Sequence, residues 1–141
     1  MREILFRGQT RKNGEKVEMA TGEKVPGHWV YGGIFPGTGD YSIIYGGETE
    51  KDLERHVVYS ETVGQYTGLN DKNGNRIFEG DIIKRFLLGA EIIYCVRYDG
   101  ENAHFIGKAL NKNGFTTFDG DGEMFEVICN IHDNPELLKG E

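Results

Sequence analysis

Cysteine and proline are scarce in this chain, and it has no long apolar run. Its 141 residues include two cysteines, three prolines and one tryptophan. Neither Cys95 nor Cys129 belongs to a Cys-x-x-Cys pair, which argues against a zinc-ribbon site and favours buried free thiols. No segment approaches the roughly 20 apolar residues of a membrane-spanning helix. The N-terminus is charged rather than apolar, so we expect a soluble cytoplasmic protein.

Positive charge is also in short supply. Lysine and arginine number 16 against 23 aspartates and glutamates, which gives a net charge of −7 and a pI near 5.1. A surface of this sign repels phosphates, so non-specific nucleic-acid binding is disfavoured.

Glycine, by contrast, is abundant at 21 residues, and aromatic residues make up 11%. The tripeptide Lys-Asn-Gly occurs three times, beginning at Lys12, Lys72 and Lys112, each time between β-like segments. Asn-Gly accommodates the positive φ angles of tight turns. The sequence therefore predicts successive antiparallel hairpins.

The stretch from Gln65 to Asp81 connects two such β regions. Its turn, Asp71 to Gly74, is flanked by strand-like residues on both sides, which favours a hairpin. Polar side chains gather here, and they either set the architecture of the hairpin or line a polar site. The candidate residues of this stretch are Tyr66, Thr67, Asn70, Asp71 and Asp81.

Five short strands are expected after Asp81. The longest covers 91–98, where Ile92, Tyr94, Val96 and Tyr98 form one apolar face. We predict a mainly β fold of two small subdomains, 1–64 and 65–141, or one integrated domain. The second would be a small, partly open barrel of SH3-like or OB-like type. The segment 133–138, with Pro135 at a first helical position, predicts a short C-terminal helical turn.

Aromatic residues also gather in the first half of the chain, where Trp29, Tyr31, Tyr41 and Tyr45 lie in adjacent predicted strands. They either fill a thin β core or form a contact patch, since Trp and Tyr are favoured interface anchors. We take Trp29 and Tyr31 as candidate interface residues.

No catalytic arrangement is visible in the sequence. The histidines at 28, 56, 104 and 132 are not spaced for a helical metal site, and no nucleophile elbow is present. We therefore expect a protein that is not an enzyme and that needs no cofactor or metal.

Three blocks resemble the YopX family of phage and prophage proteins. They are 2–8 at the N-terminus, 62–82 around the Asp-Lys-Asn-Gly turn, and 125–138 near the C-terminus. The resemblance implies a small β-rich protein of a mobile element, located in the cytoplasm of a bacterial host, and it supplies no catalytic residues. Cys129 stands where relatives usually have Gly, and Val17 to Pro26 resembles an insertion, which suggests an extra hairpin near 17–26.

Taken together, these patterns predict a non-catalytic accessory protein that binds a macromolecule, a protein in the first place, and that self-assembles into a homo-oligomer. Two alternatives stay open: a nucleic-acid-binding module that uses the C-terminal barrel, and an acidic DNA mimic.

Overall fold

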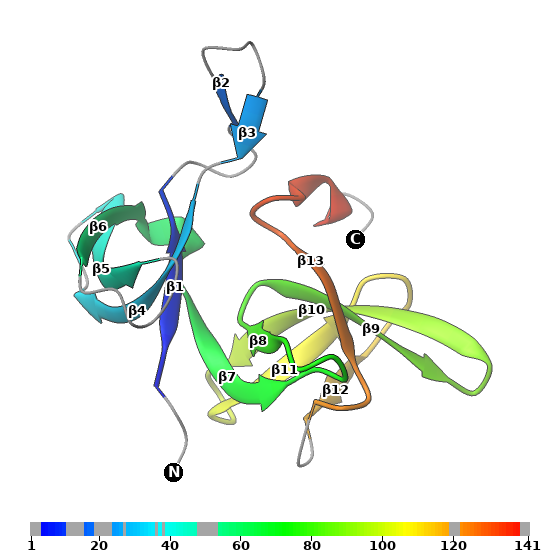
Figure 1. Ribbon diagram of the computed structural model, residues 1–141. Helices are drawn as coiled ribbons and strands as arrows, with labels where there is room; N and C mark the ends of the chain where they lie inside the picture. Colours follow the sequence, from blue (N-terminus) through cyan, green and yellow to red (C-terminus); the bar gives the residue numbers. More distant parts are fainter. Residues whose placement is uncertain are drawn as a thin grey trace. The chain divides into compact units, whose positions relative to one another are not determined.

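The chain forms two compact units, Met1–Gln65 and Tyr66–Glu141. The computed structural model describes residues 4–10, 16–18, 24–26, 28–35, 37, 39–47, 54–118 and 122–138. Most of them lie in antiparallel β-strands (Figure 1), which confirms the mainly β prediction. Within these ranges the helical elements are two 3-10 turns, η1 (Ser60–Thr62) and η2 (Pro135–Leu138).

The strands of the N-terminal unit belong to a six-stranded antiparallel sheet in the order β6-β5-β4-β1-β7-β8, whose last strand is β8 (Arg76–Phe78). The other strands are β1 (Phe6–Gln9), β4 (Trp29–Phe35), β5 (Tyr41–Gly47), β6 (Glu54–Tyr59) and β7 (Gly64–Asn70). The sheet curls, so that β1 and β6 approach each other although they do not pair. A Cβ added at Gly8 of β1 would lie 2.7 Å from Cγ2 of Val58 in β6. The buried side chains Val30, Ile44 and Val58 fill the inside of this curl.

Two short strands, β2 (Lys16–Glu18) and β3 (Lys24–Pro26), pair as a separate antiparallel ribbon in which Val17 lies opposite Val25. Its two strands lie at the ends of the stretch 17–26, where an extra hairpin is expected from the sequence. The residues between its strands, 19–23, and the first Lys-Asn-Gly turn at Lys12 lie outside the described residues.

Strand β7 runs from one unit into the other. Gly64 and Gln65 pair with β1, whereas Tyr66 and Asn70 pair with β8 (Arg76–Phe78). The C-terminal unit then forms a five-stranded antiparallel sheet in the order β12-β11-β10-β9-β13. Its strands are β9 (Asp81–Leu87), β10 (Ala90–Asp99), β11 (His104–Ala109), β12 (Phe115–Thr117) and β13 (Glu126–Asn130). The five strands expected after Asp81 are therefore present.

One face of this sheet carries the core of the C-terminal unit. Ile92, Tyr94 and Val96 of β10 are buried, as their alternation predicts, while Tyr98 at the end of the strand is half exposed. The ring of Tyr94 meets that of Phe125 edge-on at 6.0 Å. Strands β12 and β13 lie at opposite edges, so the described strands form an open sheet and no closed barrel. The SH3-like or OB-like detail stays a prediction, whereas the C-terminal helical turn is confirmed as η2.

The turn between β9 and β10 places a leucine in an unusual position. Leu88 has φ +53° and Gly89 has φ +80°, the pattern of a two-residue hairpin turn with both central residues left-handed. Leu88 is also 98% exposed, so packing of its side chain does not offset the backbone strain.

We expect Leu88→Asn to raise the free energy of unfolding by about 1 kcal/mol, because Asn tolerates the left-handed region far better than Leu does. Urea denaturation followed by circular dichroism measures the difference. A Leu88→Asn protein that is no more stable than the parent would contradict this reading of the turn.

Candidate binding surfaces

The carboxylate of Asp71, in the central stretch, is buried and accepts three backbone hydrogen bonds. Only 3% of the residue is exposed. Its Oδ1 accepts hydrogen bonds from the backbone N–H groups of Asn73 at 2.9 Å and Asn75 at 2.8 Å. Its Oδ2 accepts one from the N–H of Val127 at 2.9 Å, which ties the turn to β13, 56 residues away in the sequence. The carboxylate therefore joins the Asp71–Gly74 turn to β13 within the C-terminal unit.

These bonds set the ionisation of Asp71. Burial by itself raises the pKa of the carboxyl, but the hydrogen bonds from Val127, Asn75 and Asn73 outweigh it and hold the pKa below its ordinary value. Asp71 is thus a buried carboxylate that stays charged because backbone N–H groups surround it.

The neighbouring polar candidates also bond within the chain. Thr67 Oγ1 donates to the carbonyl of Ile77 at 2.8 Å, and Tyr66 Oη donates to Oδ1 of Asn70 at 2.6 Å. Oδ2 of Asp81, a residue that is 2% exposed, accepts from the N–H of Phe78 at 2.7 Å. The structure brings these candidates together around one hairpin, where their hydrogen bonds hold β7, β8 and β9 in register.

A second group of side chains covers the outer side of the curled N-terminal sheet. Facing pairs are Phe35 with Ile43 and Ile43 with Val57, so three apolar residues form one row across β4, β5 and β6. In the next row Tyr41 lies opposite Tyr59, with ring centroids 5.1 Å apart. We call the following set the aromatic face: Phe35, Tyr41, Ile43, Tyr45, Arg55, Val57 and Tyr59.

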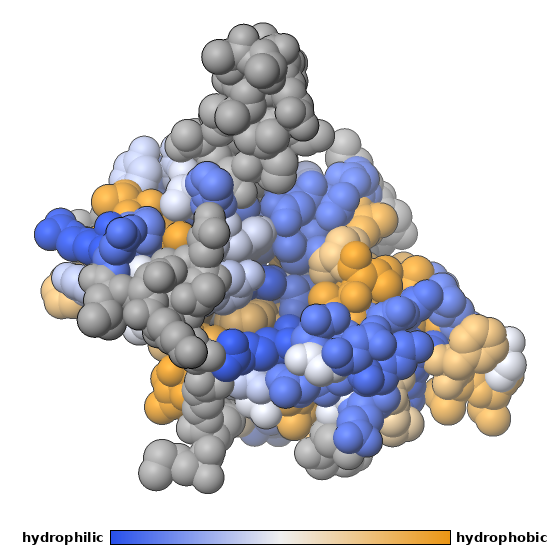
Figure 2. Space-filling model, viewed as in Figure 1, coloured by the Kyte–Doolittle hydropathy of each residue, from blue (hydrophilic) through white to orange (hydrophobic). Residues whose placement is uncertain are grey.

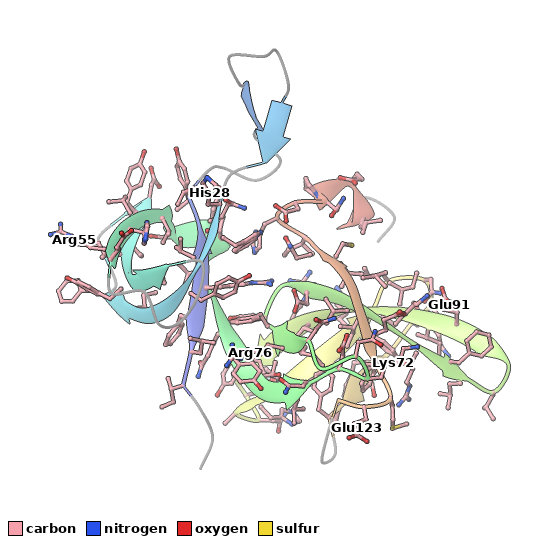
Figure 3. The ribbon with its side chains drawn as sticks, viewed as in Figure 1. His28, Arg55, Lys72, Arg76, Glu91 and Glu123 are labelled. Carbon is pink, nitrogen blue, oxygen red and sulfur yellow. The ribbon has the colours of Figure 1, made fainter. Side chains whose placement is uncertain are left out.

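The aromatic face is largely open to solvent. Phe35 is 62% exposed, Val57 56%, Tyr41 51% and Tyr45 50%. Arg55 lies opposite Tyr45 and points outward from β6 (Figure 3). The alternate residues of the same strands, such as Ile44 and Val58, are buried on the inner side. Exposed tyrosine, phenylalanine and arginine side by side on a rigid sheet are typical of a protein-binding surface.

Trp29 and Tyr31 lie on this same side of β4, because they alternate in phase with Phe35. Both are only partly exposed, and the guanidinium of Arg7 stacks over the Trp29 ring at 4.6 Å. Trp29 and Tyr31 are the interface candidates predicted from the sequence, whose patterns do not single out Phe35, Arg55 or Val57. The period-two alternation of 29–35 and 54–59 places these residues on one side of their strands, but it does not say whether that side faces the core or the solvent.

Within the described residues, the titratable side chains do not gather into a metal site. Among the residues that the structure describes, no group of three or more histidines, cysteines, aspartates or glutamates is close enough to hold a metal ion. His56 pairs with Glu54 at 3.6 Å and His104 with Asp99 at 3.5 Å, each in its own unit. In the same ranges, no helix is long and apolar enough to cross a membrane.

Comparison with known proteins gives a family but no assigned activity. No curated protein matches the chain. Among solved structures, the chain is similar to protein EF1440 from Enterococcus faecalis, with 22% identity, a TM-score of 0.44, and coverage of 98% of this chain and 99% of that one. The model of the family described as YopX protein matches residues 35–139, which is most of the chain. The chain therefore belongs to the YopX family.

Proposed function

We propose that this protein is a non-catalytic accessory module of a phage or prophage, and that it binds a protein partner in the cytoplasm of the bacterial host. The aromatic face carries the proposal. Seven side chains of three adjacent strands present tyrosine, aliphatic and arginine groups on one side of a sheet whose other side is already filled. Such a surface is costly to leave in water and is of the composition that binding hot spots favour.

The charge balance supports a protein rather than a nucleic acid as the partner. Arg55 is the one cation of the aromatic face as defined here, and the whole chain carries a net charge of −7. Nucleic-acid binding draws most of its affinity from several cations that contact phosphates. A second copy of this chain is one protein that could occupy the face, since isologous contacts pair identical patches.

We expect Phe35→Ser to reduce capture of the partner from lysate of a phage-induced host by about tenfold, as the loss of an exposed aromatic anchor would. Captured proteins are quantified by mass spectrometry against the parent chain. Phe115→Ser is the matched control, because Phe115 is exposed to a similar extent, 67% against 62%, but lies in the other unit.

Three outcomes separate the alternatives. Equal capture by Phe35→Ser and Phe115→Ser would contradict the assignment to the aromatic face. Sedimentation equilibrium tests whether a second copy of the chain occupies the aromatic face. If it does, Phe35→Ser should shift the oligomer toward monomer. Anisotropy titration with a single-stranded oligonucleotide at low salt tests the nucleic-acid alternative, and binding at micromolar protein would favour it over the proposal.

A further inference from the structure

In the part of the chain that the structure describes, the outer end of β9 pairs with β10 on one side and has no strand on the other. Strand β13 pairs with β9 only as far as Lys84, which lies opposite Glu126. Arg85, Phe86 and Leu87 continue the strand and pair with β10 alone among the described residues. The outer end of β9 is therefore a short open sheet edge next to the start of β13.

The backbone of Phe86 faces this open edge. The N–H of Ile93 donates to Oδ1 of Asn111 at 3.1 Å and its carbonyl accepts from the N–H of Leu110 at 2.8 Å, so Ile93 is directed toward β11. Successive residues of a strand face alternate neighbours, which directs Ile92 toward its β9 partner Arg85. Phe86, the next residue, then directs its N–H and carbonyl away from β10, where a further strand could pair with them.

A surface hollow of about 430 Å³ adjoins this edge. Its lining combines exposed apolar side chains with charged ones: Lys72, Lys84, Arg85, Phe86, Glu91, Met124 and Glu126. Phe86 is 73% exposed and Met124 61%. Apolar surface is visible along the β9–β10 hairpin in Figure 2. The hollow thus offers an apolar contact beside a row of ionic groups.

The ionic groups of the hollow are unequal in number, with three cations and two carboxylates. Lys84 Nζ lies 3.6 Å from Glu91 and 3.8 Å from Glu126, and Lys72 Nζ lies 3.8 Å from Glu126 (Figure 3 labels Lys72 and Glu91). Among the described residues, Arg85 is the cation of the hollow that has no carboxylate partner. Its guanidinium stacks over the Phe125 ring at 5.4 Å and the Tyr94 ring at 6.0 Å. Its buried Nε has no hydrogen-bond partner in the part of the chain described.

We propose that this hollow binds an extended peptide segment of a partner protein in which an acidic residue is flanked by apolar ones. The segment would add to β9 opposite Phe86, place its carboxylate on Arg85, and rest its apolar neighbours on Phe86 and Met124. Strand addition to an open edge gives main-chain hydrogen bonds, and a planar guanidinium held by aromatic rings suits a carboxylate. A single carboxylate fits the local charge balance, whereas a polyphosphate chain would also meet Glu91, Glu126 and the acidic surface of the chain.

Selection from a phage-displayed library of random peptides about ten residues long, against the immobilised full chain, tests the proposal because strand-addition ligands are short and extended. We expect the enriched peptides to share Asp or Glu beside an apolar residue. Arg85→Lys, which keeps the charge but not the two-pronged geometry, should weaken their binding by about tenfold. Phe86→Ala should weaken it as well.

Arg97→Lys is the matched control, because Arg97 also has a buried Nε with no hydrogen-bond partner in the described ranges but does not line the hollow. Failure to enrich any peptide would overturn the proposal, as would peptides whose binding is equal in Arg85→Lys and the parent chain. This surface is separate from the aromatic face, so Arg85→Lys should not alter capture that depends on Phe35. The two proposals can therefore fail independently.

Discussion

Replacing Asp71 by Ala is expected to lower the free energy of unfolding of the C-terminal unit by about 3 kcal/mol. The substitution removes the acceptor of three backbone N–H groups, those of Asn73, Asn75 and Val127. Because domains of this size have only about 5–15 kcal/mol of stability, the loss is a large fraction of the total. Urea denaturation monitored by far-ultraviolet circular dichroism measures it.

The pH dependence gives an independent check on Asp71. Its pKa is lowered in the folded state, so the stabilisation is fully present above the unfolded value of about 3.9 and is lost as the pH falls through the folded pKa. The stability difference between the parent and Asp71→Asn should therefore shrink below about pH 4. Asn73→Ala, in the same turn but with an exposed side chain, should change stability by no more than about 0.5 kcal/mol. An Asp71→Ala protein as stable as Asn73→Ala would contradict the account.

Replacing Gly46 by Ala should destabilise the N-terminal unit by about 3 kcal/mol or more, or prevent its folding. Gly46 lies directly opposite Gly32 between β4 and β5. A Cβ on Gly46 would lie 1.9 Å from the carbonyl oxygen of Tyr31, and one on Gly32 would lie 1.9 Å from that of Tyr45. Both carbonyl oxygens belong to the paired backbone, so a Cβ at either position can be accommodated only if β4 and β5 move apart.

Gly33→Ala provides the comparison for Gly46→Ala. Gly33 neighbours Gly32 on β4, but a Cβ there would meet no atom within 4 Å. We expect its effect to stay within about 0.5 kcal/mol, as for other open surface sites. Thermal melts of the two variants should differ clearly. Similar melting temperatures for Gly46→Ala and Gly33→Ala would show that β4 and β5 accommodate a Cβ at position 46 without loss of stability.

The sequence predicts strands and turns better than it predicts surfaces. Hairpins could be found because Asn-Gly turns and period-two alternation are local signals; β9, β10 and their apolar face follow from them. The role of Asp71 could not be found in this way, because one of its partners, Val127, is 56 residues distant. The sequence left two interpretations of this polar cluster open, hairpin architecture or a polar site, and the structure adds the backbone hydrogen bonds that Asp71 accepts.

The aromatic face shows a different limit of the sequence. In β5 both alternations contain large apolar residues, Ile44 on one side and Tyr41 and Tyr45 on the other. Which side of β5 faces the core depends on the curl of the sheet. This curl brings Gly8 of β1 close to Val58 of β6. Local patterning does not encode such a contact, so the choice between core and contact patch needed the fold.

The stack of Arg7 on Trp29 has a practical consequence for spectroscopy. Trp29 is the one tryptophan of the sequence and lies in the N-terminal unit. Its emission therefore reports on that half of the chain, where the guanidinium of Arg7 lies 4.6 Å from the ring. Trp29 emission in one unit and the pH-dependent stabilisation by Asp71 in the other therefore report on the two halves of the chain separately.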